Sequence, residues 1–188
     1  MNKIEGWEYS SYLIGAMSKT KENDGGASFR ENVQRELLGR GVFPINPAQL
    51  EKQKTGMTTM DAIEKINGWV SSGKRVLLKQ TGRNIWKGKT IVAEDGNLIH
   101  ICGDLDYVKL SDWITFVYPL GSKPLGTFFE CGVSIDSNIP VYIITDIPKK
   151  DLGQSLILGV EAIDGIFFEN LAQYLEFIDK TYSLKKGE

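Results

Sequence analysis

Three separate clusters of the 188-residue sequence bring together side chains that can carry out nucleophilic attack and proton transfer. The first is a short apolar run with a tyrosine, the second is an Asp-Leu-Asp string, and the third is a glycine-flanked glutamate. Their candidate site residues are Tyr12, Gly15, Met17, Asp104, Asp106, Asp112, Gly126 and Glu130. These residues include a phenol and several carboxylates but no histidine. They therefore indicate that carboxyl groups would carry out the nucleophilic attack and the proton transfer.

Glu130 is the most informative of these residues. The sequence predicts it in the first turn of a helix that follows a strand, between Gly126 and Gly132, and glycines there let a ligand approach the backbone. A carboxylate at a helix N-terminus is kept ionised, as a nucleophile requires. Thr127-x-x-Glu130 is also the spacing of a capping box, which is purely structural. A nucleophilic carboxylate and a capping-box residue would both place Glu130 at the start of the helix, so the spacing does not distinguish between these two roles.

The other acidic and phenolic groups also have two interpretations each. Asp104 and Asp106 suit a turn or a helix cap, but either is also a candidate for a second carboxyl group that gives a proton to a leaving group. Tyr12 suits core packing, or a phenol that hydrogen-bonds to Glu130 and orients it.

The segments around these clusters predict alternating strands and helices. Helices are expected from an N-cap at Ser28, with Glu31 three residues later, and over further periodic segments. The alternation predicts an α/β fold, a doubly wound, mostly parallel five-stranded sheet of flavodoxin or Rossmann type. Ligands of such sheets bind beyond the carboxyl ends of the strands, which places the loops after Ala16 and Tyr118 at the site. Four strands of this sheet are located in the sequence, at Tyr12–Ala16, Val42–Ile45, Trp113–Tyr118 and Pro140–Ile144, and the later helices are Thr58–Ser72, Thr127–Asp136 and Asn170–Tyr182.

One segment has a different character. Arg75–Leu78, Thr90–Ala93 and Leu98–Ile101 predict short strands, and Asp95-Gly96 predicts a hairpin turn. We therefore expect a single domain over 1–188 with an antiparallel hairpin inserted at about 74–101. Six basic residues and no acidic ones lie between positions 74 and 93: Lys74, Arg75, Lys79, Arg83, Lys87 and Lys89. With Trp86 they form either a solvated surface or a contact for a nucleotide phosphate or a nucleic-acid backbone.

The overall composition excludes several classes of protein. The formal net charge is −2, so no global field attracts nucleic acid or an anionic membrane. No apolar run approaches the roughly 20 residues of a membrane span, and the first residues do not form a signal peptide. Cys102 and Cys131 are too few for a disulfide framework, and with the single histidine, His100, they do not predict a zinc site. We expect a cytoplasmic protein with no metal, in which His100 and Cys131 are structural.

The three clusters, in this order, resemble the nucleoside 2-deoxyribosyltransferase-like superfamily, which includes nucleotide N-glycosidases. The resemblance covers residues 11–45 and 103–145. It is carried by the strand end that follows Tyr12, by Gly103-Asp104-Leu105 followed by Ser111-Asp112-Trp113, and by Gly126-Thr127-Phe128-Phe129-Glu130-Cys131-Gly132.

The resemblance implies cleavage of the N-glycosidic bond of a (2′-deoxy)nucleoside or its 5′-monophosphate. Glu130 would attack the anomeric carbon and form a covalent glycosyl-enzyme, Asp104 would contact the base and assist its protonation, and Tyr12 would position Glu130. The sugar would pass to another base or to water, without a metal or an organic cofactor. Relatives form homo-oligomers, so we expect one here. The residues expected to bind substrate are Gly15, Met17, Asp106, Asp112, Ser122, Lys123 and Gly126.

The sequence departs from the family pattern six positions before Glu130. Transferases of the family often have an acidic residue there, and this chain has Pro124. The preceding Ser122 and Lys123 are candidate ligands of a 5′-phosphate, or Lys123 is simply solvated. Two other functions stay open, a non-catalytic nucleotide-binding module and an NAD-cleaving enzyme of the TIR type.

Overall fold

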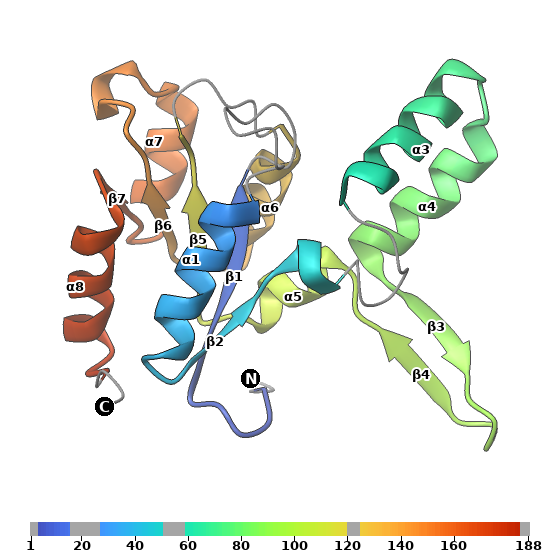
Figure 1. Ribbon diagram of the computed structural model, residues 1–188, viewed down its shortest axis with the longest axis horizontal. Coiled ribbons are helices and arrows are strands. Elements are labelled where there is room, and N and C mark those ends of the chain that lie inside the picture. The colour runs from blue at the N-terminus through green and yellow to red at the C-terminus, as the bar shows by residue number, and fades with distance from the viewer. Residues whose placement is uncertain (1–3, 16–26, 51–58, 120–124, 185–188) are drawn as a thin grey trace.

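Five parallel strands form the central sheet of the protein. The computed structural model describes residues 4–15, 27–50, 59–119 and 125–184. The strand order is β2-β1-β5-β6-β7, with every neighbouring pair parallel (Figure 1). This order is the flavodoxin-like 2-1-3-4-5 arrangement, and it confirms the predicted doubly wound fold. The strands are β1 (Tyr9–Gly15), β2 (Val42–Ile45), β5 (Trp113–Val117), β6 (Val141–Ile144) and β7 (Ile166–Phe168).

Helices cover both faces of this sheet. Because side chains alternate along a strand, Leu13 of β1 packs on one face while Tyr12 and Ile14 pack on the other. The Leu13 face is covered by α1 (Ala27–Leu38) and α8 (Leu171–Thr181), and the Tyr12 face by α5 (Asp104–Leu110), α6 (Leu125–Asp136) and α7 (Gln154–Glu161). These layers, which we call the α/β core, hold the candidate site residues that the structure describes.

Buried hydroxyl groups join β1 and β5 to α8. The Oγ of Ser11 lies 2.7 Å from the Oγ1 of Thr115, which lies 2.6 Å from the phenol oxygen of Tyr174. The indole N–H of Trp113 donates to the same phenol at 3.0 Å. Because each of these buried polar groups has a partner, the hydrogen bonds offset the cost of desolvation and favour this register of β1 against β5.

Residues 59–101 project from the α/β core as what we call the arm (Figure 1). The arm consists of α3 (Thr59–Ser71), α4 (Arg75–Lys87), β3 (Lys89–Val92) and β4 (Leu98–Ile101). The predicted hairpin at Asp95-Gly96 is confirmed: β3 and β4 pair antiparallel, and Gly96 has a φ of +82°. The predicted strand Arg75–Leu78 is wrong, because these residues begin the 13-residue helix α4. Four residues are too short to distinguish the two periodicities.

Two glycines make the joint between the arm and the α/β core. Gly88, between α4 and β3, has a φ of +68°, and Gly103 precedes α5. A Cβ added to Gly103 would lie 2.2 Å from the backbone nitrogen of Gly88. A backbone contact that only glycine permits therefore holds the middle of the arm, at Gly88, against Gly103, where the chain re-enters the core.

Several elements differ from the sequence expectations. The short strand β7 and the helices α5 and α7 were not predicted, and the first helix already includes Ala27, so Ser28 is not its N-cap. The predicted cap at Thr58 lies outside the described residues. Within the described ranges, no helix is long and apolar enough to cross a lipid bilayer.

Candidate active site

The candidate site lies beside β1 and β5, where the order of the strands reverses direction. In doubly wound sheets this switch point, at the carboxyl ends of the strands, is the usual place for a ligand. Gly15 ends β1 there, and a Cβ on it would lie 2.9 Å from the backbone oxygen of Val117 in β5. Close packing between two strands accounts for this glycine. The predicted substrate residue Met17, which follows it, lies outside the described residues.

The structure brings Tyr12 and Glu130 into contact. The phenol of Tyr12 donates a hydrogen bond of 3.0 Å to Oε1 of Glu130, and both side chains are buried. Tyr12 comes from the middle of β1 and Glu130 from α6, 118 residues apart. The hydrogen bond matches the contact that the sequence suggested for Tyr12.

The position of Glu130 within its helix differs from the prediction. Helix α6 already includes Leu125, so Glu130 lies beyond the first turn, and Thr127 is a buried residue inside the helix. The capping-box interpretation of Thr127 and Glu130 is therefore wrong. The expected contribution of the first turn to ionising Glu130 also disappears, because the effect of a helix N-terminus falls off within that turn.

Burial instead keeps a proton on Glu130. Burial is the largest cause, and together with the negative charge of Asp104 it raises the pKa of Glu130 to about 8. The hydrogen bond from Tyr12 and the positive charge of Arg30 act in the opposite direction. Burial and the charge of Asp104 therefore oppose the ionised state that the sequence analysis expected for Glu130.

Arg30 is a site residue that the sequence reasoning missed. It belongs to α1, on the other face of the sheet, yet its side chain is buried and its charge acts on Glu130. Charged residues are almost never fully buried unless they have a partner. No local pattern identifies it in the sequence, because a charged residue on a predicted helix is ordinarily exposed.

Asp104 completes the group around Glu130. It is the first residue of α5, and its charge acts on both Tyr12 and Glu130. Burial raises the pKa of Tyr12 well above its usual value, and the Glu130 and Asp104 carboxylates raise it further. The phenol therefore stays protonated and serves as a hydrogen-bond donor.

Two of the other predicted carboxylates do not join this group. Asp106 accepts hydrogen bonds from the backbone N–H of Gly103 at 2.9 Å and lies 2.9 Å from Nε2 of His100. Asp112 precedes β5 at the amino ends of the strands, where it accepts hydrogen bonds from the backbone N–H and the hydroxyl of Ser10. Gly126 lies in α6, whereas Ser122 and Lys123 lie outside the described residues.

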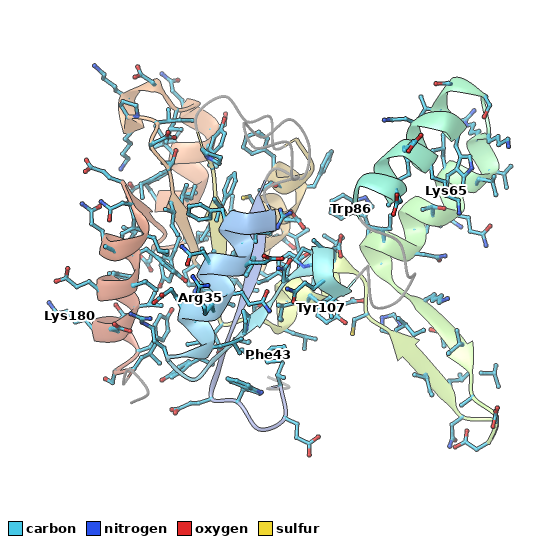
Figure 2. All side chains as sticks on the ribbon, in the orientation of Figure 1. Arg35, Phe43, Lys65, Trp86, Tyr107 and Lys180 are labelled. Atoms are coloured by element: carbon cyan, nitrogen blue, oxygen red, sulfur yellow. The ribbon has the colours of Figure 1, made fainter. Side chains whose placement is uncertain are left out.

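Aromatic side chains connect the arm to the surroundings of Glu130. The rings of Trp86, in α4, and Phe129, in α6, pack edge to face with centroids 6.1 Å apart. Figure 2 shows Trp86 on the side of the arm that faces the α/β core. Phe129 stays 71% exposed, which leaves an apolar surface one residue from Glu130. The six basic residues between positions 74 and 93 are all exposed, on or beside α4 and at the start of β3.

The arrangement is a pair of acidic groups with one buried phenol donor and one buried cation. Such a set can hold a single proton between its two carboxyl groups, deliver it to a leaving group and present the other carboxylate to an electrophilic carbon. The one metal-ligating group among the described residues is His100, Cys102 and Asp106.

Comparisons with known proteins add one finding. No family model matches the chain, and no curated protein matches it. The solved structure of a 2-deoxyribosyltransferase from the psychrotolerant bacterium Bacillus psychrosaccharolyticus matches with a TM-score of 0.55 and 13% sequence identity, over 95% of this chain and 99% of that one. At this identity the match shows a shared fold, which agrees with the fold implied by the sequence resemblance.

Proposed function

We propose that the protein cleaves the N-glycosidic bond of a (2′-deoxy)nucleoside or a nucleoside 5′-monophosphate through a covalent intermediate on Glu130. The observation that carries this proposal is the buried hydrogen bond between Tyr12 and Glu130, with Asp104 close enough to raise the pKa of both. The shared fold with a deoxyribosyltransferase supports the same chemistry.

The shared proton assigns the roles of the two acidic groups. Because burial and the charge of Asp104 raise the pKa of Glu130 to about 8, the pair can carry one proton near neutral pH. In the reactive form the proton sits on Asp104 and Glu130 is ionised. Asp104 then protonates the departing base while a Glu130 oxygen forms a bond to the anomeric carbon, so the carbon–nitrogen bond breaks with its electron pair on the base. An incoming base or water then forms a bond to the anomeric carbon and gives its proton to the Asp104 carboxylate, while the glycosyl–Glu130 bond breaks with its electron pair on Glu130.

Tyr12 and Arg30 act on Glu130 rather than on the substrate. Both lower its pKa, which favours the ionised form that attacks. Tyr12 occupies one oxygen of the carboxylate and so leaves the other for the sugar. Trp86 and Phe129 offer an aromatic surface on which a nucleobase can stack.

Two alternatives are separated from this proposal by experiment. A non-catalytic nucleotide-binding module would not need three interacting ionisable groups in the core. An NAD-cleaving enzyme of the TIR type would use a related fold with a different substrate. The homo-oligomer expected from the resemblance also remains a proposal, and light scattering on the purified chain tests it.

The direct test measures the release of free base by mass spectrometry. The full-length protein is incubated with nucleosides, deoxynucleosides, their 5′-monophosphates and NAD, with and without a second base as acceptor. We expect base release from the nucleosides or the monophosphates, and a swapped nucleoside or a free sugar then separates transferase from hydrolase. Release of nicotinamide from NAD alone would support the TIR type. No release, with binding still detected by thermal shift, would support a binding module.

A further inference from the structure

Three metal-ligating side chains converge where β4 passes into α5. A nitrogen of His100, the sulfur of Cys102 and a carboxylate oxygen of Asp106 all lie within 4.8 Å of one another. The three residues fall within seven positions of the chain, as His-x-Cys-x-x-x-Asp. They are distinct from Tyr12 and Glu130, and the proposed function assigns them no role.

The three ligand atoms lie near enough for side-chain rotation to bring them to the spacing of a tetrahedral site. Zinc bonds of about 2.0–2.1 Å to nitrogen or oxygen and about 2.3 Å to sulfur put neighbouring ligand atoms about 3.4–3.6 Å apart. Nε2 of His100 and Oδ2 of Asp106 are now 2.9 Å apart, so they must separate by about half an ångström. Rotation of the two side chains can produce this separation, because the His100 side chain is 49% exposed and the Asp106 side chain is 34% exposed.

The surroundings already orient one of the ligands. The backbone N–H of Gly103 donates to Oδ2 of Asp106 at 2.9 Å, and hydrogen bonds of this kind typically hold a ligating carboxylate in place. The tight contact between Gly103 and Gly88 fixes the backbone that carries Cys102 and Asp106. Most of the ordering of the site is therefore present in the fold.

We propose that His100, Cys102 and Asp106 bind one divalent transition-metal ion, with zinc as the best match. A mixed imidazole, thiolate and carboxylate set suits Zn²⁺ and disfavours Mg²⁺ or Ca²⁺, which take oxygen ligands. Binding replaces the thiol proton of Cys102, which is released to water, and a water molecule completes the tetrahedron. The ion would fasten the end of β4 to the first turn of α5, the turn that begins with Asp104.

Cobalt titration of the metal-free full-length protein tests the site without any assay of activity. We expect one Co²⁺ per chain, with a thiolate-to-cobalt absorption band that Zn²⁺ removes by displacement. Cys102→Ser should abolish the band, and His100→Gln and Asp106→Asn should each weaken binding more than tenfold. Cys131→Ala is the matched control, because Cys131 is a buried cysteine of α6 outside the cluster. It should bind Co²⁺ like the parent chain.

Thermal melts with and without Zn²⁺ give a second readout that does not depend on a spectrum. Zn²⁺ should raise the melting temperature of the parent chain and of Cys131→Ala, and should leave that of Cys102→Ser unchanged. His100 does not belong to the cap of α5, which is formed by Gly103 and Asp106. The variant His100→Gln therefore keeps the test informative if Asp106→Asn folds poorly. The proposal is overturned if no thiolate band forms, if Cys102→Ser retains it, or if Cys131→Ala loses it.

Discussion

The α/β core and the arm differ in how their apolar side chains are covered. In the core, Leu13 and Ile143 are completely buried, whereas in the arm Val76 and Leu98 are 78% and 75% exposed. Helix α4 contains no buried residue, and every residue of β3 is exposed. Burial therefore specifies the conformation of the core, while the arm depends on local hydrogen bonds and on the glycine joint.

The carboxylates of the two regions differ in the same way. Burial raises the pKa of Glu130 in the core to about 8. In the exposed turn of the arm, hydrogen bonds from the backbone and side chain of Asn97 lower the pKa of Asp95. These hydrogen bonds favour the ionised form of the arm carboxylate, whereas the core supplies a carboxyl group that can exchange a proton near neutral pH. The comparison assigns the chemistry to the core.

Removing the carboxylate of Glu130 should have the largest effect. Glu130→Gln keeps the size of the side chain and a hydrogen-bond acceptor for Tyr12 but removes the nucleophile, so we expect base release to fall by at least about 10³-fold. Glu94→Gln is the matched control, because Glu94 is an exposed glutamate of the arm. It should leave the rate of base release unchanged. Equal losses in the two variants would contradict the assignment of chemistry to the core.

Stability should depend on pH through Glu130. Its pKa is about 8 in the folded protein and 4.5 as an ordinary glutamate, so the folded state binds the extra proton. That contribution is fully present below pH 4.5 and is lost as the pH rises through 8, by up to about 5 kcal/mol. Urea denaturation from pH 5 to pH 9 should show a steeper loss of stability for the parent chain than for Glu130→Gln. Identical slopes would mean that Glu130 is ionised in the folded state.

A matched pair of valines compares the packing of the two regions. Val141 is completely buried in β6, and Val92 is 69% exposed in β3. Val141→Ala should lower the free energy of unfolding by about 2 kcal/mol, because methyl groups leave the core and a cavity remains. Val92→Ala should change it by less than about 0.5 kcal/mol in urea denaturation. A similar cost at both positions would show that the arm is covered in solution, by a second copy for example.

The smallest effect is expected for Tyr12→Phe. The substitution removes one hydrogen bond to Glu130, worth about 1 kcal/mol, and should slow base release roughly fivefold. Because that hydrogen bond lowers the pKa of Glu130, its loss should move the alkaline limb of the pH profile of kcat/KM to higher pH. A slower rate with an unshifted pH profile would assign Tyr12 a packing role alone.

The buried parts of the fold were predictable because burial leaves a pattern in the sequence. Strands β1, β2, β5 and β6 appear as apolar runs, and the predicted bounds differ from the observed ones by a few residues. Strand β7 has only three residues, which is too short to form a pattern of its own. Helix α5 was missed because Asp104 and Asp106 resemble turn residues, although Asp106 in fact accepts a hydrogen bond from the N–H before the helix.

The electrostatics of the site were less predictable than its residues. The sequence pointed to Tyr12, Asp104 and Glu130, which the structure groups together. It did not reveal that Glu130 lies beyond the first turn of α6, because the start of that helix has no strong cap signal. Arg30 was missed because a charged residue on a helix is ordinarily exposed. The place of Glu130 within α6 and the burial of Arg30 both depend on tertiary packing, which leaves no pattern in the local sequence.

The most direct test of the central claim is mass mapping of Glu130 after rapid acid quenching of the enzyme during turnover. The account predicts that the peptide carrying Glu130 gains the mass of one sugar, and that the same peptide of Glu130→Gln does not. It would be contradicted if the parent protein released base while that peptide stayed unmodified and the sugar product had the inverted anomeric configuration.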